Sequence, residues 1–378
     1  MTAPDQLLRE WPPGYGGVER VAHGLAAEQG GTVFSLLPPL AASDPLPVSY
    51  ARRRIRSVCL GRLLLPLPGP PLWTLLASPE PLVAHLPCPT VLLLALLARA
   101  LRPTRPVTFY WHAFLAPRSG LAGRLEQLYQ WFALRMLRPF PVISTSPVLL
   151  AALQAEGLSA AHLACLPCAL TPAAETSAAQ IWTQRQAGLQ PRGRVIAIGR
   201  LDSYKRIDWL LHAAATTPSV DRIDLVGDGP DRVRLEALAR QLLSPHQRVE
   251  FHGRVNEQRK RQLLAQADVL VLPADRCNEA FGLVQLEAMA CGVPSLAFAL
   301  PRSGMHWVSQ LPALSWSGDP RQLPQVLEQL LTDPILYSQV CIQARQRYLQ
   351  DFALAQWRER LAGCDGWPAP LEQEWSCG

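Results

Sequence analysis

Two glutamates, Glu279 and Glu287, stand eight positions apart in the stretch NEAFGLVQLEAMACGVP (278–294). A strand-like VLVLP precedes this stretch, which predicts Glu279 in the loop at the strand's end and Glu287 about a turn and a half inside the next helix. Carboxylates accept hydrogen bonds from hydroxyl groups, and a helix N-terminus presents free backbone N–H groups to phosphate oxygens. A carboxylate pair near a sugar is also typical of glycoside hydrolysis, so the chemistry of the pair stays open at this point.

A second group of candidates is cationic. Arg200 and Lys205 lie in GRLDSYKRID, directly after the strand-like VIAIG. Two cations near a helix N-terminus suit a diphosphate and the charge that develops on a leaving phosphate. They could equally be surface charges, but lysine occurs only at 205 and 260 in this arginine-rich chain, which favours a specific role for Lys205.

Further loops follow neighbouring strands. Gly227 and Gly229 lie in VGDGP, and HGRV (252–255) follows the next strand. Backbone groups in such loops could hold a nucleotide base, although each motif alone is an ordinary turn between a strand and a helix.

The first half offers weaker candidates. PPGYGGVER places Gly14, Gly16 and Gly17 in a turn between a short strand, QLLREW (6–11), and a helix. This arrangement is a plausible phosphate or sugar cradle, although a turn that needs positive φ would also use glycine. His112 ends the buried strand PVTFYWHAF, a position suited to a cleft, and a hydrogen-bonded loop histidine is the competing interpretation.

The elements that must position these residues alternate regularly from Arg194 onward. Short apolar runs at 195–199, 222–227, 249–253, 269–273 and 294–299 predict strands, with amphipathic segments between them predicting helices. This order predicts a parallel sheet with helices on both faces. TPAAETSAAQIWTQRQAGLQPRG (171–193) is interpreted as an interdomain linker, the segment from Pro334 to about Leu361 as one long helix, and residues 38–90 match no clear pattern.

Composition narrows the class of protein. The 378 residues are 49% hydrophobic and 17% charged, which is typical of globular domains. Nine scattered cysteines and a polar start predict free thiols in a reducing cytoplasm, and the pair Cys165 and Cys168 is expected to pack in the core rather than bind metal. No stretch is apolar enough to span a membrane.

The net charge of +6 is concentrated in the first half, where residues 1–178 carry 14 Arg, no Lys and 9 Asp or Glu. A basic first half suits an anionic membrane surface, and a basic surface without a partner explains the charge equally well. GLAGRLEQLYQWFALRMLRP (120–139) is an amphipathic helix pattern, whose apolar side is expected to pack in the core rather than to contact a membrane.

Four motifs together carry a resemblance to a known family. GRLDSYKRIDWLL, LVGDGPDRVRLEALA, VEFHGRV and NEAFGLVQLEAMACGVPSLAF, in this order and spacing, resemble the retaining GT-B glycosyltransferases of family 4. The match covers about residues 194–300, and PPGYGGVER and TFYWHAF extend it more loosely into the first half. The stretch LPALSWSGDP (311–320) departs from the family, which usually carries a glycine-containing segment there.

The resemblance implies an α/β protein of GT-B architecture with two Rossmann-like domains, at 1–178 and 179–340, and a last segment, 341–378, that crosses back to the first. It implies metal-independent transfer of a hexose from a nucleotide sugar, with retention at the anomeric carbon and no cofactor. Glu279 would bind the hexose beside Phe281 and Gly282, Glu287 the ribose, and Arg200 and Lys205 the diphosphate. Other donor contacts would come from Gly16, Gly17, Gly227, Gly229, Arg254, Val255 and Leu283, and His112 would line the transfer site.

SGMHWVS (303–309) is similar to a bacterial subgroup that adds mannose or related sugars to polysaccharide lipid intermediates. The likeness favours a GDP-sugar donor over a UDP-sugar, a glycan or lipid-linked glycan acceptor, no nucleic-acid partner, and a cytoplasmic protein at the inner face of the plasma membrane. A UDP-sugar 2-epimerase and a non-catalytic partner of another transferase are the rival interpretations, because fold alone does not fix function. The cationic loop argues against a glycosidase, which needs no phosphate leaving group.

Overall fold

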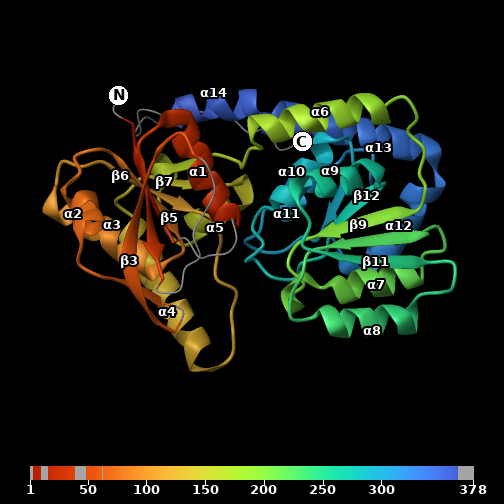
Figure 1. Cartoon of the computed structure of the whole chain (residues 1–378), viewed down its shortest axis with the longest axis horizontal. Coiled ribbons are helices and arrows are strands. Elements are labelled where there is room, and N and C mark those ends of the chain that lie inside the picture. The colour runs from red at the N-terminus through yellow and green to blue at the C-terminus, as the bar shows by residue number, and fades with distance from the viewer. Residues whose placement is uncertain (1–2, 10–15, 39–47, 62, 365–378) are drawn as a thin grey trace. The chain divides into compact units, whose positions relative to one another are not determined.

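The computed structural model of the chain describes residues 3–9, 16–38, 48–61 and 63–364. It divides into two compact units, the first comprising Met1–Pro167 and Arg360–Gly378 and the second Cys168–Glu359. Each unit is built on its own sheet (Figure 1), as expected for an α/β protein with two Rossmann-like domains. The division falls after Pro167, before the boundary predicted after residue 178.

The sheet of the first unit has eight strands in the order β4-β3-β2-β1-β5-β6-β7-β8. Its neighbours are parallel except for β3 and β4, which form an antiparallel pair at one end. Central strands such as VTFYW are buried on both faces, as parallel strands between helices must be. The strands are β1 (Asp5–Leu8), β2 (Thr32–Leu37), β3 (Ala51–Leu60), β4 (Leu63–Pro66), β5 (Leu82–Leu86), β6 (Val107–Trp111), β7 (Val142–Ser144) and β8 (Leu163–Cys165).

Among the described residues, five α-helices connect these strands. The chain marks their starts with small or capping residues: Ser146 accepts a hydrogen bond from the Leu149 N–H at 3.3 Å, and Pro147 occupies the first helical turn. The helices are α1 (Gly17–Gln29), α2 (Pro70–Ala77), α3 (Pro89–Leu101), α4 (Gly120–Leu137) and α5 (Pro147–Ala155).

The second unit contains a parallel five-stranded sheet in the order β11-β10-β9-β12-β13. The strands are β9 (Arg194–Ile198), β10 (Arg222–Val226), β11 (Arg248–Gly253), β12 (Val269–Leu272) and β13 (Ser295–Ala297). Helices α7 (Ile207–Ala215) and α8 (Arg232–Leu242) cover one face, and α9 (Glu257–Gln266) and α10 (Leu283–Ala290) the other (Figure 1). All five strands predicted from Arg194 onward are therefore confirmed.

Several predictions outside this sheet need correction. Residues 171–193 are not simply a linker: they contain α6 (Pro172–Arg185), whose Trp182 ring lies against Gly292. The long final helix is interrupted, since α13 (Pro334–Arg347) ends in a π-helical turn (Tyr348–Phe352) before α14 (Leu354–Cys364). The first strand, β1, ends at Leu8, and the last two residues of the predicted QLLREW lie outside the described residues. The unparsed region 38–90 holds β3, β4, α2 and β5 among its described residues.

The expectation for residues 120–139 is also wrong in part. Gly123, Gln130, Ala133, Leu134 and Leu137 of α4 are buried, but its leucines at 121, 125 and 128 and its aromatic residues Trp131 and Phe132 are exposed. The apolar side of this helix is thus divided between the core and the surface. None of the described helices is long and apolar enough to cross a membrane.

Candidate functional site

The candidate residues of the second unit gather at one edge of its sheet. Parallel strands end at the same edge, so the loops after β9, β10, β11 and β12 lie together there. The chain continues from β9 to β10 on one side, whereas β12 pairs with β9 on the other. The crevice between the loops after β9 and β12 is therefore the topological switch point, where ligands bind in open α/β sheets.

Lys205 and Glu279 meet across this switch point. The Lys205 ammonium group, from the loop after β9, donates a hydrogen bond to the Glu279 carboxylate, from the loop after β12. Their side chains are 11% and 18% exposed. Burial lowers the Lys205 pKa, but the adjacent carboxylate outweighs burial, so the net pKa is raised and the amine stays charged. The resemblance implies one donor site for both residues, and the structure shows a direct contact between their side chains.

The backbone around Glu279 is held from both sides. The Ser303 hydroxyl donates to the Glu279 carbonyl at 2.6 Å, and the Gly304 N–H donates to the Ala280 carbonyl at 2.7 Å. On the β9 side, the Asp275 N–H donates to the Tyr204 carbonyl at 3.0 Å. These bonds fix the loop that carries Glu279 relative to the loop that carries Lys205, so the carboxylate has a defined position.

The start of α10 completes this edge. Gly282 precedes the helix with φ of +75°, and an added Cβ would lie 2.4 Å from Leu272 Cδ2, so only glycine fits. No side chain caps the helix, which leaves its first N–H groups available to an anion. The Phe281 ring packs edge-on against Phe352 at 5.9 Å and is buried, so a backbone contact from this residue to a donor sugar stays a prediction. Leu283 is half-buried.

Glu287 forms a second lysine pair. Its carboxylate lies 2.8 Å from the Lys260 ammonium group, which projects from α9 and also contacts Glu257 at 2.9 Å. The side chains of Lys260 and Glu287 are 9% and 10% exposed. The sequence analysis missed Lys260 as a site residue, although one signal was visible: Lys260 is the other of the chain's two lysines. In the structure, each lysine pairs with one of the two candidate glutamates.

Arg200 does not join the Lys205 pair. Its guanidinium lies 2.8 Å from Asp202, and its side chain is 65% exposed. Arg254 is exposed and Val255 half-buried in the loop after β11. These three side chains lie at the border of this edge of the sheet, away from the Lys205–Glu279 pair.

Gly227 and Gly229 have a packing reason for being glycine. A Cβ on Gly227 would lie 1.9 Å from the Gly199 carbonyl oxygen, and one on Gly229 2.4 Å from the Leu201 carbonyl oxygen. Both glycines therefore allow the loop after β10 to approach the loop after β9. A role in binding a nucleotide base stays a prediction.

The glycine turn of the first unit can be described only in part, because Gly14 lies outside the described residues. Gly16 and Gly17 are exposed where α1 begins. Gly16 has φ of −79°, so a need for positive φ does not explain this glycine. An added Cβ would meet Glu19 Oε2 at 2.7 Å, the far end of a flexible side chain.

His112 follows β6 and is buried within a polar chain. Its Nε2 lies 2.8 Å from His85 Nδ1, and His85 Nε2 lies 2.9 Å from Gln6 Oε1. The Tyr110 ring stacks on His112 with centroids 4.3 Å apart. Burial lowers the His112 pKa to about 3, so its imidazole is neutral and can give or accept a hydrogen bond but carries no charge near neutral pH. The sequence analysis missed His85, one residue before the end of β5, and Gln6, one residue after the start of the neighbouring parallel strand β1.

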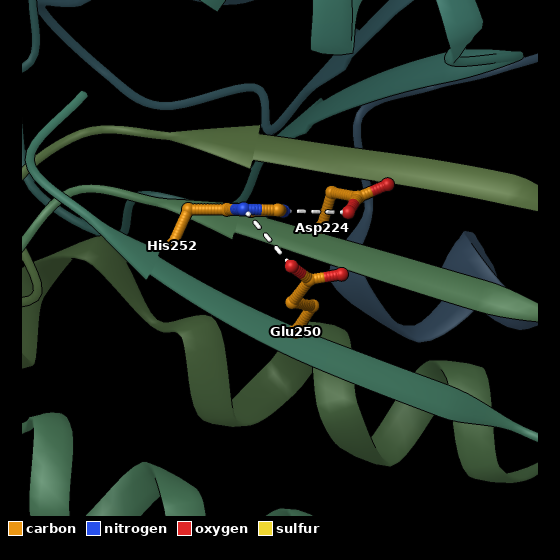
Figure 2. A group of neighbouring side chains, drawn as sticks. All are labelled: Asp224, Glu250 and His252. Carbon is orange, nitrogen blue, oxygen red and sulfur yellow. Dashed lines mark hydrogen bonds and ion pairs between the residues drawn. The ribbon is translucent and has the colours of Figure 1, made fainter. Parts of the chain in front are cut away.

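A separate cluster on β10 and β11 contains groups that bind metals elsewhere. Figure 2 shows His252 between Asp224, at 2.7 Å, and Glu250, at 3.4 Å. The Arg222 guanidinium also contacts both carboxylates, at 2.9 and 2.5 Å. Burial raises the Asp224 pKa, but the hydrogen bonds from Arg222 and His252 outweigh it and lower the net pKa. Arg222 pairs with both carboxylates, so it already supplies positive charge at the place where a metal ion would have to bind.

Comparisons with known proteins agree with this geometry. Residues 192–333, which contain most of the candidate edge, match the family model described as glycosyl transferases group 1. An uncharacterised glycosyltransferase of Methanocaldococcus jannaschii is 39% identical over 114 residues, 29% of this chain and 28% of that protein. A D-inositol 3-phosphate glycosyltransferase of Salinispora arenicola is 32% identical over 208 residues, 51% of this chain and 45% of that protein. The chain thus spans less than half the length of these curated relatives.

Solved structures extend the similarity to the whole fold. Anabaena HepE in complex with UDP and glucose has a TM-score of 0.70 at 17% identity, covering 96% of this chain and 99% of that one. WaaG, involved in lipopolysaccharide biosynthesis, has a TM-score of 0.64 at 18% identity, with 96% and 99% coverage. The fold is that of GT-B glycosyltransferases.

Proposed function

We propose that this chain is a group 1 glycosyltransferase of family 4 that transfers a hexose from a nucleotide diphosphate sugar, with retention, to a glycan or lipid-linked glycan. The observation that carries the proposal is the Lys205–Glu279 pair at the switch point of the second unit. In this pair, a cation that suits the diphosphate lies beside a carboxylate that suits the sugar. The match of residues 192–333 to the glycosyltransferase model supports the same assignment.

The roles proposed for the two glutamates and for Lys205 are those that the motif resemblance implies. Glu287 accepts hydrogen bonds from the ribose hydroxyls, and Glu279 from the hexose hydroxyls. Lys205 neutralises the diphosphate between them, with Arg200 at the exposed rim. A carboxylate has acceptor sites for several donors, so each glutamate can keep its lysine while it binds a hydroxyl. The uncapped start of α10 adds backbone N–H groups for the phosphate or sugar.

In the transfer step, the bond between the anomeric carbon and the leaving phosphate oxygen breaks. The acceptor oxygen forms its bond to the same carbon on the same face, and its proton passes to the leaving phosphate. Lys205 stabilises the negative charge that builds on that phosphate, a contribution that electrostatic preorganisation makes large.

The nucleoside of the donor is the part of the proposal that a binding test can resolve directly. Guanosine is favoured by the SGMHWVS segment, and uridine is the second candidate because HepE binds UDP. We expect GDP to raise the melting temperature of the full chain more than UDP, ADP or dTDP do, since a ligand that binds only the folded state stabilises it. At a concentration 100 times its Kd, the gain is about 2.7 kcal/mol.

A larger shift with UDP would move the donor to a UDP-sugar and leave the proposed transfer chemistry in place. No shift with any nucleotide would contradict a donor site at this edge. Release of an epimerised free sugar without any acceptor would favour the 2-epimerase instead, and nucleotide binding without turnover would favour a non-catalytic partner.

Metal removal is the second test in solution. We expect excess EDTA to leave the initial rate of transfer unchanged, because Lys205 supplies the positive charge that a divalent ion gives the leaving diphosphate in metal-dependent enzymes. The measurement is the initial rate of transfer, first with EDTA and again after Mg²⁺ or Mn²⁺ is added in excess. A rate that EDTA abolishes and Mg²⁺ or Mn²⁺ restores would contradict the metal-independent mechanism.

The charge of the first unit supports a lipid-linked acceptor. Its arginine excess suits an anionic surface, and a lipid-linked acceptor would hold the enzyme there. We therefore propose a peripheral protein at the inner face of the plasma membrane, working on a membrane-embedded glycan intermediate.

A further inference from the structure

The outward face of α4 combines exposed apolar and basic side chains. At 100° per residue, the exposed leucines, aromatic residues and arginines of α4, together with Arg138 directly after it, fall within an arc of about 140° around the helix. We call this arc the α4 face: it consists of Leu121, Arg124, Leu125, Leu128, Trp131, Phe132, Arg135 and Arg138. Leu121 is 73% exposed, Leu128 59% and Trp131 60%. Globular proteins rarely leave five large apolar side chains exposed on one helix without a partner.

The orientation of this helix is fixed by its other side. Ala133, Leu134 and Leu137 are buried in the core of the first unit. The Gln130 side-chain oxygen accepts from the Leu115 N–H at 2.6 Å, and Gly123 lies so close to the preceding loop that a Cβ would be 1.9 Å from the Arg118 carbonyl oxygen. A rotation that buried the leucines would expose the core residues and break these contacts. The α4 face therefore points outward because of the fold.

The charges on the α4 face have one sign. Arg124 and Arg135 stand among the leucines and Arg138 follows the helix, while no acidic residue lies within the arc. Glu126, the one acidic residue of α4, lies off the arc and pairs with Arg118 at 3.2 Å. Apolar side chains interleaved with arginine, and a tryptophan among them, are the pattern of helices that lie in the plane of an anionic membrane surface.

The neighbouring helix extends the pattern. α3 contacts α4 and exposes Leu93, Leu97 and Leu101 at spacings of one helical turn. Arg102 follows them directly and is exposed as well. Two adjacent helices of the first unit thus display leucines and arginines together.

We propose that the α4 face docks onto a bilayer of anionic phospholipid, inserting its leucines and Trp131 among the acyl chains and placing its arginines at the lipid phosphates. The proposal rests on the proposed function only in giving that function its membrane acceptor; docking itself needs neither donor nor transfer. The sequence suggested membrane contact by a basic first half as a whole, and the proposal assigns that contact to one helix face.

The test uses the full chain and vesicles of phosphatidylcholine, with or without phosphatidylglycerol, in a co-sedimentation assay. We expect binding to vesicles that contain phosphatidylglycerol, and Leu128→Glu to weaken it at least about tenfold, because a carboxylate opposes both insertion and the lipid phosphates. The matched control is Val233→Glu, which places the same charge at a 77% exposed valine on α8 of the second unit and is expected to bind as the wild type does.

A second pair of changes separates charge from insertion. Arg124→Gln with Arg135→Gln is expected to weaken binding to the anionic vesicles at least about tenfold and to reduce its salt dependence. Failure of the wild type to bind phosphatidylglycerol vesicles, or equal binding by Leu128→Glu, would overturn the proposal. A wild-type dimer that Leu128→Glu converts to a monomer, with no vesicle binding, would overturn it too by assigning the α4 face to a second copy of the chain.

Nucleotide-dependent melting of the same variants keeps the two proposals apart. Vesicle binding without any stabilisation by nucleotide would leave the docking surface in place and contradict the transferase. Normal nucleotide stabilisation without vesicle binding would contradict the docking surface and leave the proposed transferase in place.

Discussion

Replacing Glu279 with glutamine is expected to lower kcat/KM for sugar transfer at least about 100-fold, since the carboxylate gives the hexose charge-assisted hydrogen bonds in the transition state. The affinity for the nucleoside diphosphate without its sugar should be unchanged, because Glu279 lies at the sugar end of the site. Steady-state rates with the full donor and calorimetric titration with the nucleoside diphosphate give the two quantities. Wild-type-like turnover in this variant would remove Glu279 from the mechanism.

The choice of glutamine follows from the Lys205 pair. Alanine would abolish transfer too, but it would leave the nearly buried Lys205 ammonium group without a partner, which is strongly destabilising. A glutamine oxygen still accepts a hydrogen bond from Lys205, so the loss of rate can be separated from a loss of fold. Glu236→Gln, the same change in the surface pair that Glu236 forms with Arg232 on α8, is the matched control and should leave transfer unchanged.

The second sheet was predictable because local signals agreed there. Each strand from Arg194 onward is a short apolar run bounded by glycine or a charged turn, and each helix has one apolar side. Parallel strands end at one edge, so the order of the motifs was enough to put the loops of Lys205 and Glu279 at the same edge of the sheet. The contact between the two side chains was not predictable, because it depends on β12 pairing with β9 rather than on distance along the chain.

In each incorrect or missing prediction, the local sequence carries no signal for the feature that the structure shows. The α4 pattern has one apolar side, and the sequence alone does not tell how much of that side neighbouring elements cover; here Leu134 is covered and Leu128 is not. The sequence also gives no sign that the last helix is interrupted after Arg347, since YLQDF contains no proline or glycine to end a helix. Residues 38–90 remained unparsed because Pro-rich boundaries hide short strands such as β4.

Replacing Glu287 with glutamine is expected to weaken nucleoside diphosphate binding by about 10- to 100-fold, because a hydrogen bond to a charged group contributes about 1.5–3 kcal/mol. The fold should tolerate the change better than it tolerates loss of Glu279. Lys260 keeps its second partner, Glu257, at 2.9 Å, so no buried charge is left alone. Calorimetric titration of wild type and variant with the same nucleotide measures the change.

The ribose assignment needs a sharper readout than affinity alone, because any disturbance of α10 would also weaken binding. Wild type should bind the nucleoside diphosphate more tightly than its 2′-deoxy form, since the missing hydroxyl leaves a nearly buried carboxylate with one hydrogen bond fewer. Glu287→Gln should reduce that preference, whereas Glu279→Gln should keep it. Inorganic pyrophosphate, which has no ribose, should bind wild type and Glu287→Gln alike. A variant that keeps the full preference for ribose would show that Glu287 only holds Lys260 in place.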